Sequence, residues 1–254
     1  MRLASMIKKH RFGQSDYRIN STETVFQGFF KMTRTVVEHR LFSGGWSQPL
    51  TREIFKRGDA VGVLLYDPVN RLVGLVEQFR LGAITEQHGP WQYEVVAGMM
   101  SQDEDPEQVA IRELREESGV EVEKLMPICD YLVSVGGTDE RMYMYCGLLD
   151  LRGKGGIFGL ESESEDILFH VWPYEEVMQA FSEGLLNSAA DPCPTTWPAP
   201  ALTTSFSVVG VEAIRERAKH APFIRGMFSV LPITRSKGRA HKWASCTITV
   251  PSMS

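Results

Sequence analysis

The segment from Gly98 to Val120 constrains the fold of this chain more than any other stretch of its sequence. Asp105 and Pro106 are a strong helix start, because Asp caps free backbone N–H groups and Pro has no N–H to leave unpaired. Gly119 suits a helix end, where a residue with positive φ is often needed. The spacing therefore predicts a helix over residues 106–118.

This helix carries three glutamates on one side. Because a helix turns about 100° per residue, Glu113, Glu116 and Glu117 fall within an arc of roughly 100°. Arg112 can pair with Glu116 one turn later, and Leu114 points to an adjacent face that can enter a core. A solvated acidic face is the simpler explanation of most such helices. Here glycines and an arginine stand in register with the glutamates, and a hard divalent cation would relieve their repulsion, so we favour a metal site.

Length and composition allow one large domain or two modest ones. The 254 residues are 43% hydrophobic, enough for a core, and the net charge of −5 argues against a general nucleic-acid binder. The four cysteines form no CxxC pair and suit free thiols in a reducing compartment. No apolar run approaches the ~18 residues of a membrane span. The basic N-terminus lacks an apolar signal core, so we expect a cytoplasmic protein, with organelle targeting as the alternative because no acidic residue precedes Asp16.

Charge and proline content divide the chain near residue 190. Residues 1–190 hold 19 basic and 29 acidic residues, whereas residues 191–254 hold 8 and 3, with seven of the thirteen prolines. We expect residues 191–254 to be a divergent, basic, proline-rich tail with little order. Two explanations of its abrupt start stay open, a genuine tail and a change of reading frame in the gene.

The first 190 residues predict an α/β (α+β) fold rich in strands. Apolar runs bounded by Gly or Pro turns suggest strands at residues 29–40, 46–55, 60–66, 72–79, 92–97, 128–135, 142–149 and 167–171. A second helix is predicted from Pro173 to about Leu185. We expect an antiparallel strand subdomain over residues 1–57, and over residues 58–190 a mixed sheet sandwiched between the two helices.

The segment 98–120 also matches the conserved box of the Nudix hydrolases, with every fixed position of that pattern filled. From about Phe12 to Ala190 the chain resembles the ADP-ribose pyrophosphatase branch of this superfamily. The stretches that carry the wider resemblance are GFF at 28–30, TREIFKRG at 51–58, YDP at 66–68, EQFR at 77–80, EVVAGM at 94–99, SVGGTDER at 134–141 and GLESESEDILFHV at 159–171.

The resemblance implies a Nudix fold and hydrolysis of ADP-ribose to AMP and ribose 5-phosphate. It implies metal ligation by the backbone carbonyl of Ala97 and by the carboxylates of Glu113, Glu117 and Glu165. Glu163 is implied as the general base, with Glu116 near the metal. Mg²⁺, or alternatively Mn²⁺, is the expected cation because all these ligands are oxygens. Without the resemblance, the acidic run that holds Glu163 and Glu165 would be read as solvated surface.

The resemblance also implies a substrate site. Phe29 matches an aromatic that can stack on adenine, and Arg80 can bind a diphosphate through its guanidinium group. The other implied contacts are Phe30, Arg52, Glu53, Arg57, Met99, Ser134, Val135, Gly136 and Glu140. Taken alone, Phe29 could equally be a core residue, and the arginines are more simply explained as surface charge. The family pattern further implies a homodimer in which Phe29 and Arg52 act across subunits.

Two other functions stay open at this stage. The pocket could take another nucleoside diphosphate sugar, such as GDP-mannose, with the same chemistry. The chain could instead be a non-catalytic Nudix-like ligand sensor, although the intact box counts against that reading.

Overall fold

The computed structural model describes residues 10–122 and 125–188. The predictions for residues 191–254 lie outside the described residues. Within residues 10–122 and 125–188, no helix is long and apolar enough to cross a membrane.

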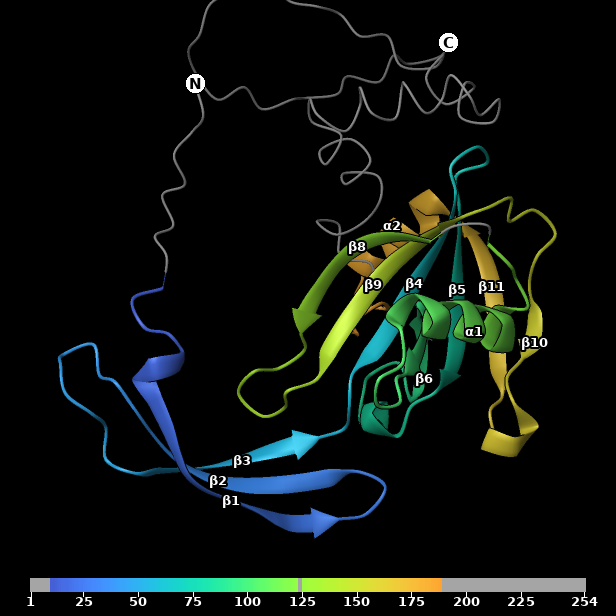
Figure 1. The fold of residues 1–254 in the computed structure, drawn as a ribbon. Helices are drawn as coiled ribbons and strands as arrows, with labels where there is room; N and C mark the ends of the chain where they lie inside the picture. The colour runs from blue at the N-terminus through green and yellow to red at the C-terminus, as the bar shows by residue number, and fades with distance from the viewer. Residues whose placement is uncertain (1–9, 123–124, 189–254) are drawn as a thin grey trace, which may run out of the picture. The chain divides into compact units, whose positions relative to one another are not determined.

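The N-terminal strands form a separate antiparallel sheet in the order β1-β2-β3 (Figure 1). Its strands are β1 (Tyr17–Gln27), β2 (Lys31–His39) and β3 (Leu50–Lys56). The strands predicted over residues 29–40 and 46–55 are found as β2 and β3, which pair antiparallel. Strand β1 was not predicted, because all eleven of its residues are exposed and it has no buried face to produce an apolar pattern. Backbone pairing with β2 holds it in place.

The larger sheet is mixed. Its path is β10-β11-β5-β4-β9-β8, with β6 paired to β5 and β7 paired to β4, and β4 runs parallel to β9. The strands are β4 (Ala60–Asp67), β5 (Leu72–Phe79), β6 (Trp91–Glu94), β7 (Val96–Met99), β8 (Leu125–Leu132), β9 (Arg141–Leu148), β10 (Gly156–Phe158) and β11 (Ile167–Pro173). Short 3₁₀ helices lie at Gln14–Asp16, Leu81–Ala83 and Glu161–Glu163.

The strand expected over residues 92–97 is in fact two strands, and this correction matters for the site. Strands β4 and β5 pair only over residues 65–67 and 72–74. Where they separate, β6 continues along β5 while β7 continues along β4. The change of partner between β6 and β7 therefore opens the sheet at one end.

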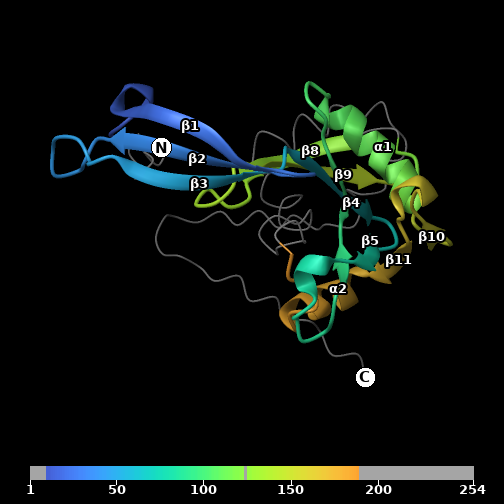
Figure 2. The same ribbon diagram turned by 90° about the horizontal axis from the view of Figure 1, so that it is seen from below.

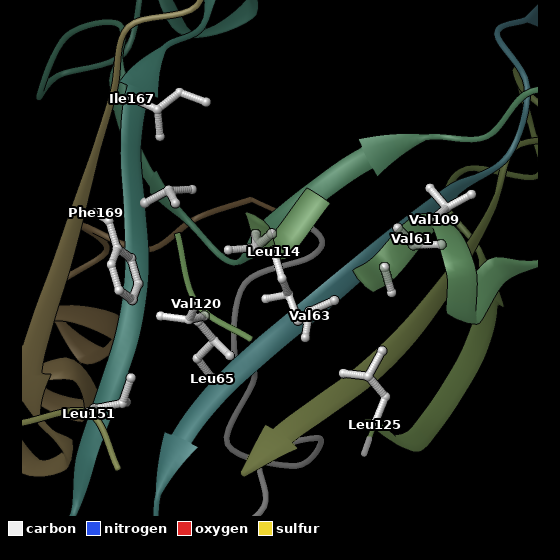
Figure 3. Close-up of a cluster of buried hydrophobic side chains, with 13 residues drawn as sticks. Val61, Val63, Leu65, Val109, Leu114, Val120, Leu125, Leu151, Ile167 and Phe169 are labelled. Carbon is white, nitrogen blue, oxygen red and sulfur yellow. The ribbon is translucent and has the colours of Figure 1, made fainter. Parts of the chain in front are cut away.

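Helices α1 (Pro106–Ser118) and α2 (Tyr174–Ser182) cover opposite faces of this sheet (Figure 2). Alternate residues of β4 show this directly. Val61, Val63 and Leu65 share a buried cluster with residues of α1, including Leu114 (Figure 3). Ala60, Leu64 and Tyr66, on the other face of β4, share a second cluster with Val177 of α2. The predicted arrangement of a mixed sheet between two helices is confirmed, although α2 ends before Leu185.

The ends of α1 form as the sequence predicts. The Asp105 side chain accepts hydrogen bonds from the backbone N–H groups of Glu107 and Gln108, at 3.0 and 3.1 Å. Gly119 has φ of 62° and closes the helix in the left-handed conformation. These two caps fix where α1 begins and ends.

Candidate active site

Two glutamates of α1 are buried against strand β7. Glu117 accepts a hydrogen bond from the backbone N–H of Ala97 at 3.0 Å and is only 3% exposed. Glu113 is 8% exposed and lies over Gly98, where a Cβ atom would overlap its carboxyl group. Gly98 is therefore required because a side chain there would occupy the space of a carboxylate.

Burial changes the acidity of both groups. It raises the pKa of Glu113 to about 7, although the adjacent Arg112 acts to lower it. The negative charges of nearby carboxylates raise this pKa further, and they belong to Glu116, Glu165 and Glu163. Burial raises the pKa of Glu117 to about 8, against the lowering effect of the Ala97 N–H group. Two carboxylates in such surroundings favour a compensating positive charge.

A loop before β11 brings more carboxylates to the same place. The backbone N–H of Gly159 donates to the carbonyl oxygen of Glu116 at 3.0 Å, which ties the loop to α1. Glu165 accepts a hydrogen bond from the Leu160 N–H at 3.1 Å. Ser164 has a positive φ of 57° and reverses the chain between the two loop glutamates, Glu163 and Glu165.

A cavity of about 1070 Å³ joins these elements. The carboxylates of α1 and of the loop line it together with residues from the N-terminal sheet and from the strand ends. The predicted site residues among its lining are Phe29, Phe30, Arg57, Arg80, Ala97, Met99, Glu113, Glu117, Glu140, Glu163 and Glu165.

Six predicted site residues do not line this cavity. Glu116 instead faces Arg112, at 3.7 Å between charged atoms. Arg52 and Glu53 lie exposed on β3, where Glu53 pairs with Arg34. The remaining three, Ser134, Val135 and Gly136, form an exposed turn between β8 and β9.

One wall of the cavity lies beside β9, and we name it the β9-side wall, formed by Phe30, Arg57 and Glu140. Arg57 lies 3.4 Å from the Glu140 carboxylate and 5.8 Å from the centre of the Phe30 ring. Glu140 is 4% exposed, so burial raises its pKa while Arg57 acts to lower it. The exposed ring of Phe29 packs edge-on against Phe30.

The opposite wall includes two residues to which the sequence reasoning gave no role. We name it the β5-side wall, formed by Gln78, Arg80 and Glu94. Glu94 accepts from Arg80 Nε at 2.6 Å and holds the guanidinium group in place. Gln78 is 8% exposed. Gln78 belongs to the stretch EQFR and Glu94 to the stretch EVVAGM, which both carry the family resemblance. Strand alternation, which places Gln78 on the same side as Arg80, could have indicated that Gln78 lies at the site.

The carboxylates of α1 and of the loop have the chemistry that a divalent cation requires, although their side chains are not arranged as a ready coordination shell. In the described part of the chain, no group of three or more His, Cys, Asp and Glu side chains forms a ready metal site. Glu117 and Glu165 are instead bonded to backbone N–H groups, and Glu113 lies 3.1 Å from Arg112. Oxygen donors on two buried and two loop carboxylates are the ligands that Mg²⁺ or Ca²⁺ prefer.

Comparisons with known proteins agree with this geometry. A model of the NUDIX domain matches residues 56–188. The ADP-ribose pyrophosphatase of Escherichia coli is 41% identical over 186 residues, which cover 73% of this chain and 89% of that protein. A GDP-mannose pyrophosphatase of Pectobacterium atrosepticum is 28% identical over 162 residues, covering 63% and 81%.

The fold has a solved counterpart as well. A crystal structure of an ADP compounds hydrolase aligns with a TM-score of 0.52 and 17% identity, over 69% of this chain and 88% of that chain. This likeness supports the fold alone. The fold and the site define a hydrolase of the Nudix family, and this chain belongs to that family. Nudix hydrolases generally use divalent metal ions.

Replacing Gly98 by Ala should disrupt the cation site, because the new Cβ would displace the Glu113 carboxyl group. We expect Gly98→Ala to lose the rise in melting temperature that saturating Mg²⁺ gives the wild-type protein. Differential scanning fluorimetry with Mg²⁺ and with EDTA measures this. Gly13→Ala is the control, since a Cβ there meets nothing within 4 Å. If Mg²⁺ stabilised Gly98→Ala as much as wild type, Glu113 would not belong to a cation site.

The raised pKa values also predict a pH dependence of stability in the absence of metal. The folded protein holds protons on Glu113 and Glu117 more tightly than the unfolded chain, whose glutamates have the ordinary pKa of 4.5. Stability contributed by these groups is therefore present below pH 4.5 and is lost as the pH rises toward about 8. In EDTA, the melting temperature should fall more steeply over this range in wild type than in Glu113→Gln/Glu117→Gln. Equal slopes would show that these carboxylates are not perturbed.

Proposed function

We propose that this protein hydrolyses the diphosphate of ADP-ribose, releasing AMP and ribose 5-phosphate, with Mg²⁺ as its cation. The observation that carries the proposal is the shared cavity, which is lined by the glutamates of α1 and of the loop, by Arg80 and by an aromatic pair. These are the groups that a nucleotide with a charged diphosphate requires. The names of the relatives at 41% identity support the same substrate.

Glu113, Glu117, Glu165 and the carbonyl oxygen of Ala97 would hold the cation. Two of these carboxylates are buried, so their charges are poorly solvated and favour a cation over water. When bound, a divalent cation neutralises charge on the diphosphate and acts as a Lewis acid. Mg²⁺ is preferred over Zn²⁺ because the donor set contains no nitrogen or sulfur.

Glu163 is the proposed general base. It lies in the loop that Gly159 ties to α1, and its side chain lines the cavity. There it can accept the proton of the attacking water and orient that water toward phosphorus. Glu116 carries the hydrogen bond that holds this loop through its backbone oxygen, and its carboxylate adds negative charge near Glu113.

Substrate binding is divided between the two walls. Phe29 is 87% exposed and presents a free aromatic face, packed at 4.8 Å against Phe30, on which a purine can stack. Arg80 is held by Glu94, which orients its remaining N–H groups for a phosphate. Met99 and the Ala97 backbone lie between these walls on β7.

The alternative substrate, GDP-mannose, is supported by the more distant relative at 28% identity. A panel of nucleoside diphosphate sugars scored by kcat/KM separates the two. We expect ADP-ribose to exceed GDP-mannose by at least about tenfold, a difference of about 1.4 kcal/mol. A preference for the guanine sugar would overturn the proposed substrate, and binding of ADP-ribose without release of AMP would favour the sensor function.

The role of Glu163 has a matched control in the same loop. Glu163→Gln removes the proton acceptor and should lower kcat at least about 100-fold at saturating Mg²⁺. Glu161→Gln removes the same charge two residues away, from a side chain outside the cavity lining, and should keep the wild-type kcat. Steady-state assays of AMP release measure both. Equal effects of the two substitutions would rule out a specific role for Glu163.

We also propose that the protein is a cytoplasmic homodimer. Strand β1 presents four large apolar side chains to solvent near its two ends, namely Tyr17, Ile19, Val25 and Phe26, and exposed apolar side chains of this kind favour association. Phe29, expected to act across subunits, lines the cavity of its own chain, whereas a dimer would give Arg52, which lies outside that cavity, access to the cavity of the partner. Light scattering should give twice 28.6 kDa, whereas an active monomer would contradict the dimer. Cys129 and Cys146 are free thiols, which suits a reducing compartment.

A further inference from the structure

Gln78 has a buried side-chain donor that the residues around it do not use. Its Nε2 atom is buried and has no hydrogen-bond partner among the described residues, while the residue as a whole is 8% exposed. Buried donors are almost always paired, because water can no longer satisfy them. Because Gln78 lines the cavity, a rotation of its side chain would present the unpaired amide to a ligand bound there.

The position of Gln78 in β5 is one where an apolar side chain would be expected. Strand alternation places Val76, Gln78 and Arg80 on the same side of the strand. Val76 is fully buried in the core beneath α1, whereas the Arg80 side chain is 44% exposed. An apolar residue at position 78 would continue the core and leave no donor unsatisfied. Gln78 thus lies where the buried core ends and the cavity begins.

The other buried unpaired atom, Arg57 Nε, has a different explanation. It lies 3.4 Å from the Glu140 carboxylate, so its charge is compensated even though the hydrogen bond is not formed. The cross-strand neighbour of Gln78, Gln92, is also satisfied, because its Nε2 donates to the Gly89 carbonyl at 2.7 Å. Gln78 has no comparable partner.

Sheet topology indicates which part of a substrate Gln78 would meet. Strands β5 and β9 lie on opposite sides of β4, and β7 pairs with β4 where β5 has diverged. The β9-side wall and the Phe29–Phe30 pair therefore lie on one side of the buried carboxylates of α1, and the β5-side wall lies on the other. If the base stacks on the aromatic pair and the diphosphate lies over the carboxylates, the sugar phosphate half lies toward the β5-side wall, which includes Gln78.

We infer that the Gln78 amide donates a hydrogen bond to an oxygen of the ribose 5-phosphate half of the substrate and so sets the preference for the sugar half. This inference rests on the proposed function. Sugar hydroxyl and phosphate oxygens both accept such a bond. A site built to donate to a substrate oxygen discriminates strongly against a ligand that lacks the acceptor.

Product inhibition tests the inference, because the two products are the two halves of the substrate. Gln78→Met keeps the length and volume of the side chain and removes its donor. We expect the Ki of ribose 5-phosphate to rise about tenfold, the equivalent of one lost hydrogen bond, while the Ki of AMP stays within about twofold. Both are measured as inhibitors of ADP-ribose hydrolysis, with melting temperatures recorded to verify folding.

Gln179→Met is the matched control. It removes an exposed glutamine of α2 that lies outside the cavity lining and whose donor is already satisfied by Glu183, so it should leave the ratio of the two Ki values unchanged. In Gln78→Met, an increase for AMP alone, an equal increase for both products, or no increase would each overturn the inference. A wild-type protein that does not hydrolyse ADP-ribose would defeat the proposed function itself, which separates the two failures.

Discussion

The burial of two glutamates between helix α1 and strand β7 is the constraint on which the rest of this site depends. Glu117 is bonded to the Ala97 N–H, and Glu113 occupies the space left open by Gly98. Both carboxylates have raised pKa values because water is largely excluded from them. Such groups are costly to keep charged, and a bound divalent cation would offset that cost.

This arrangement depends on which strands pair with each other and not only on the continuous segment 98–120. Strand β7 reaches α1 because the chain leaves β5 after β6 and then pairs with β4, and the same change of partner lies beside the cavity between the two walls. The loop with Glu163 is tied to α1 by one backbone hydrogen bond from Gly159. Carboxylates that lie far apart in the sequence are therefore brought together around helix α1.

The elements that could be predicted from the sequence are those fixed by neighbouring residues, such as helix caps and apolar runs. Helix α1 was predicted at its observed bounds because Asp105 and Gly119 cap it locally, and β5 was predicted because its apolar run is buried. Strand β1 was missed because pairing, not burial, holds it. The partner change between β6 and β7 depends on distant strands. The role of Gln78 was missed for the same reason, since an unpaired donor is visible only once its surroundings are known.

Release of AMP from ADP-ribose, followed with Mg²⁺ and with EDTA, tests the central claim most directly. Wild-type protein and Glu107→Gln, which changes an exposed glutamate in the first turn of α1, should release AMP and ribose 5-phosphate in equal amounts with Mg²⁺ and neither with EDTA. Glu117→Gln should release neither at a comparable rate in either condition. Undiminished AMP release by Glu117→Gln, or by wild-type protein in EDTA, would contradict a cation site built on the buried glutamates.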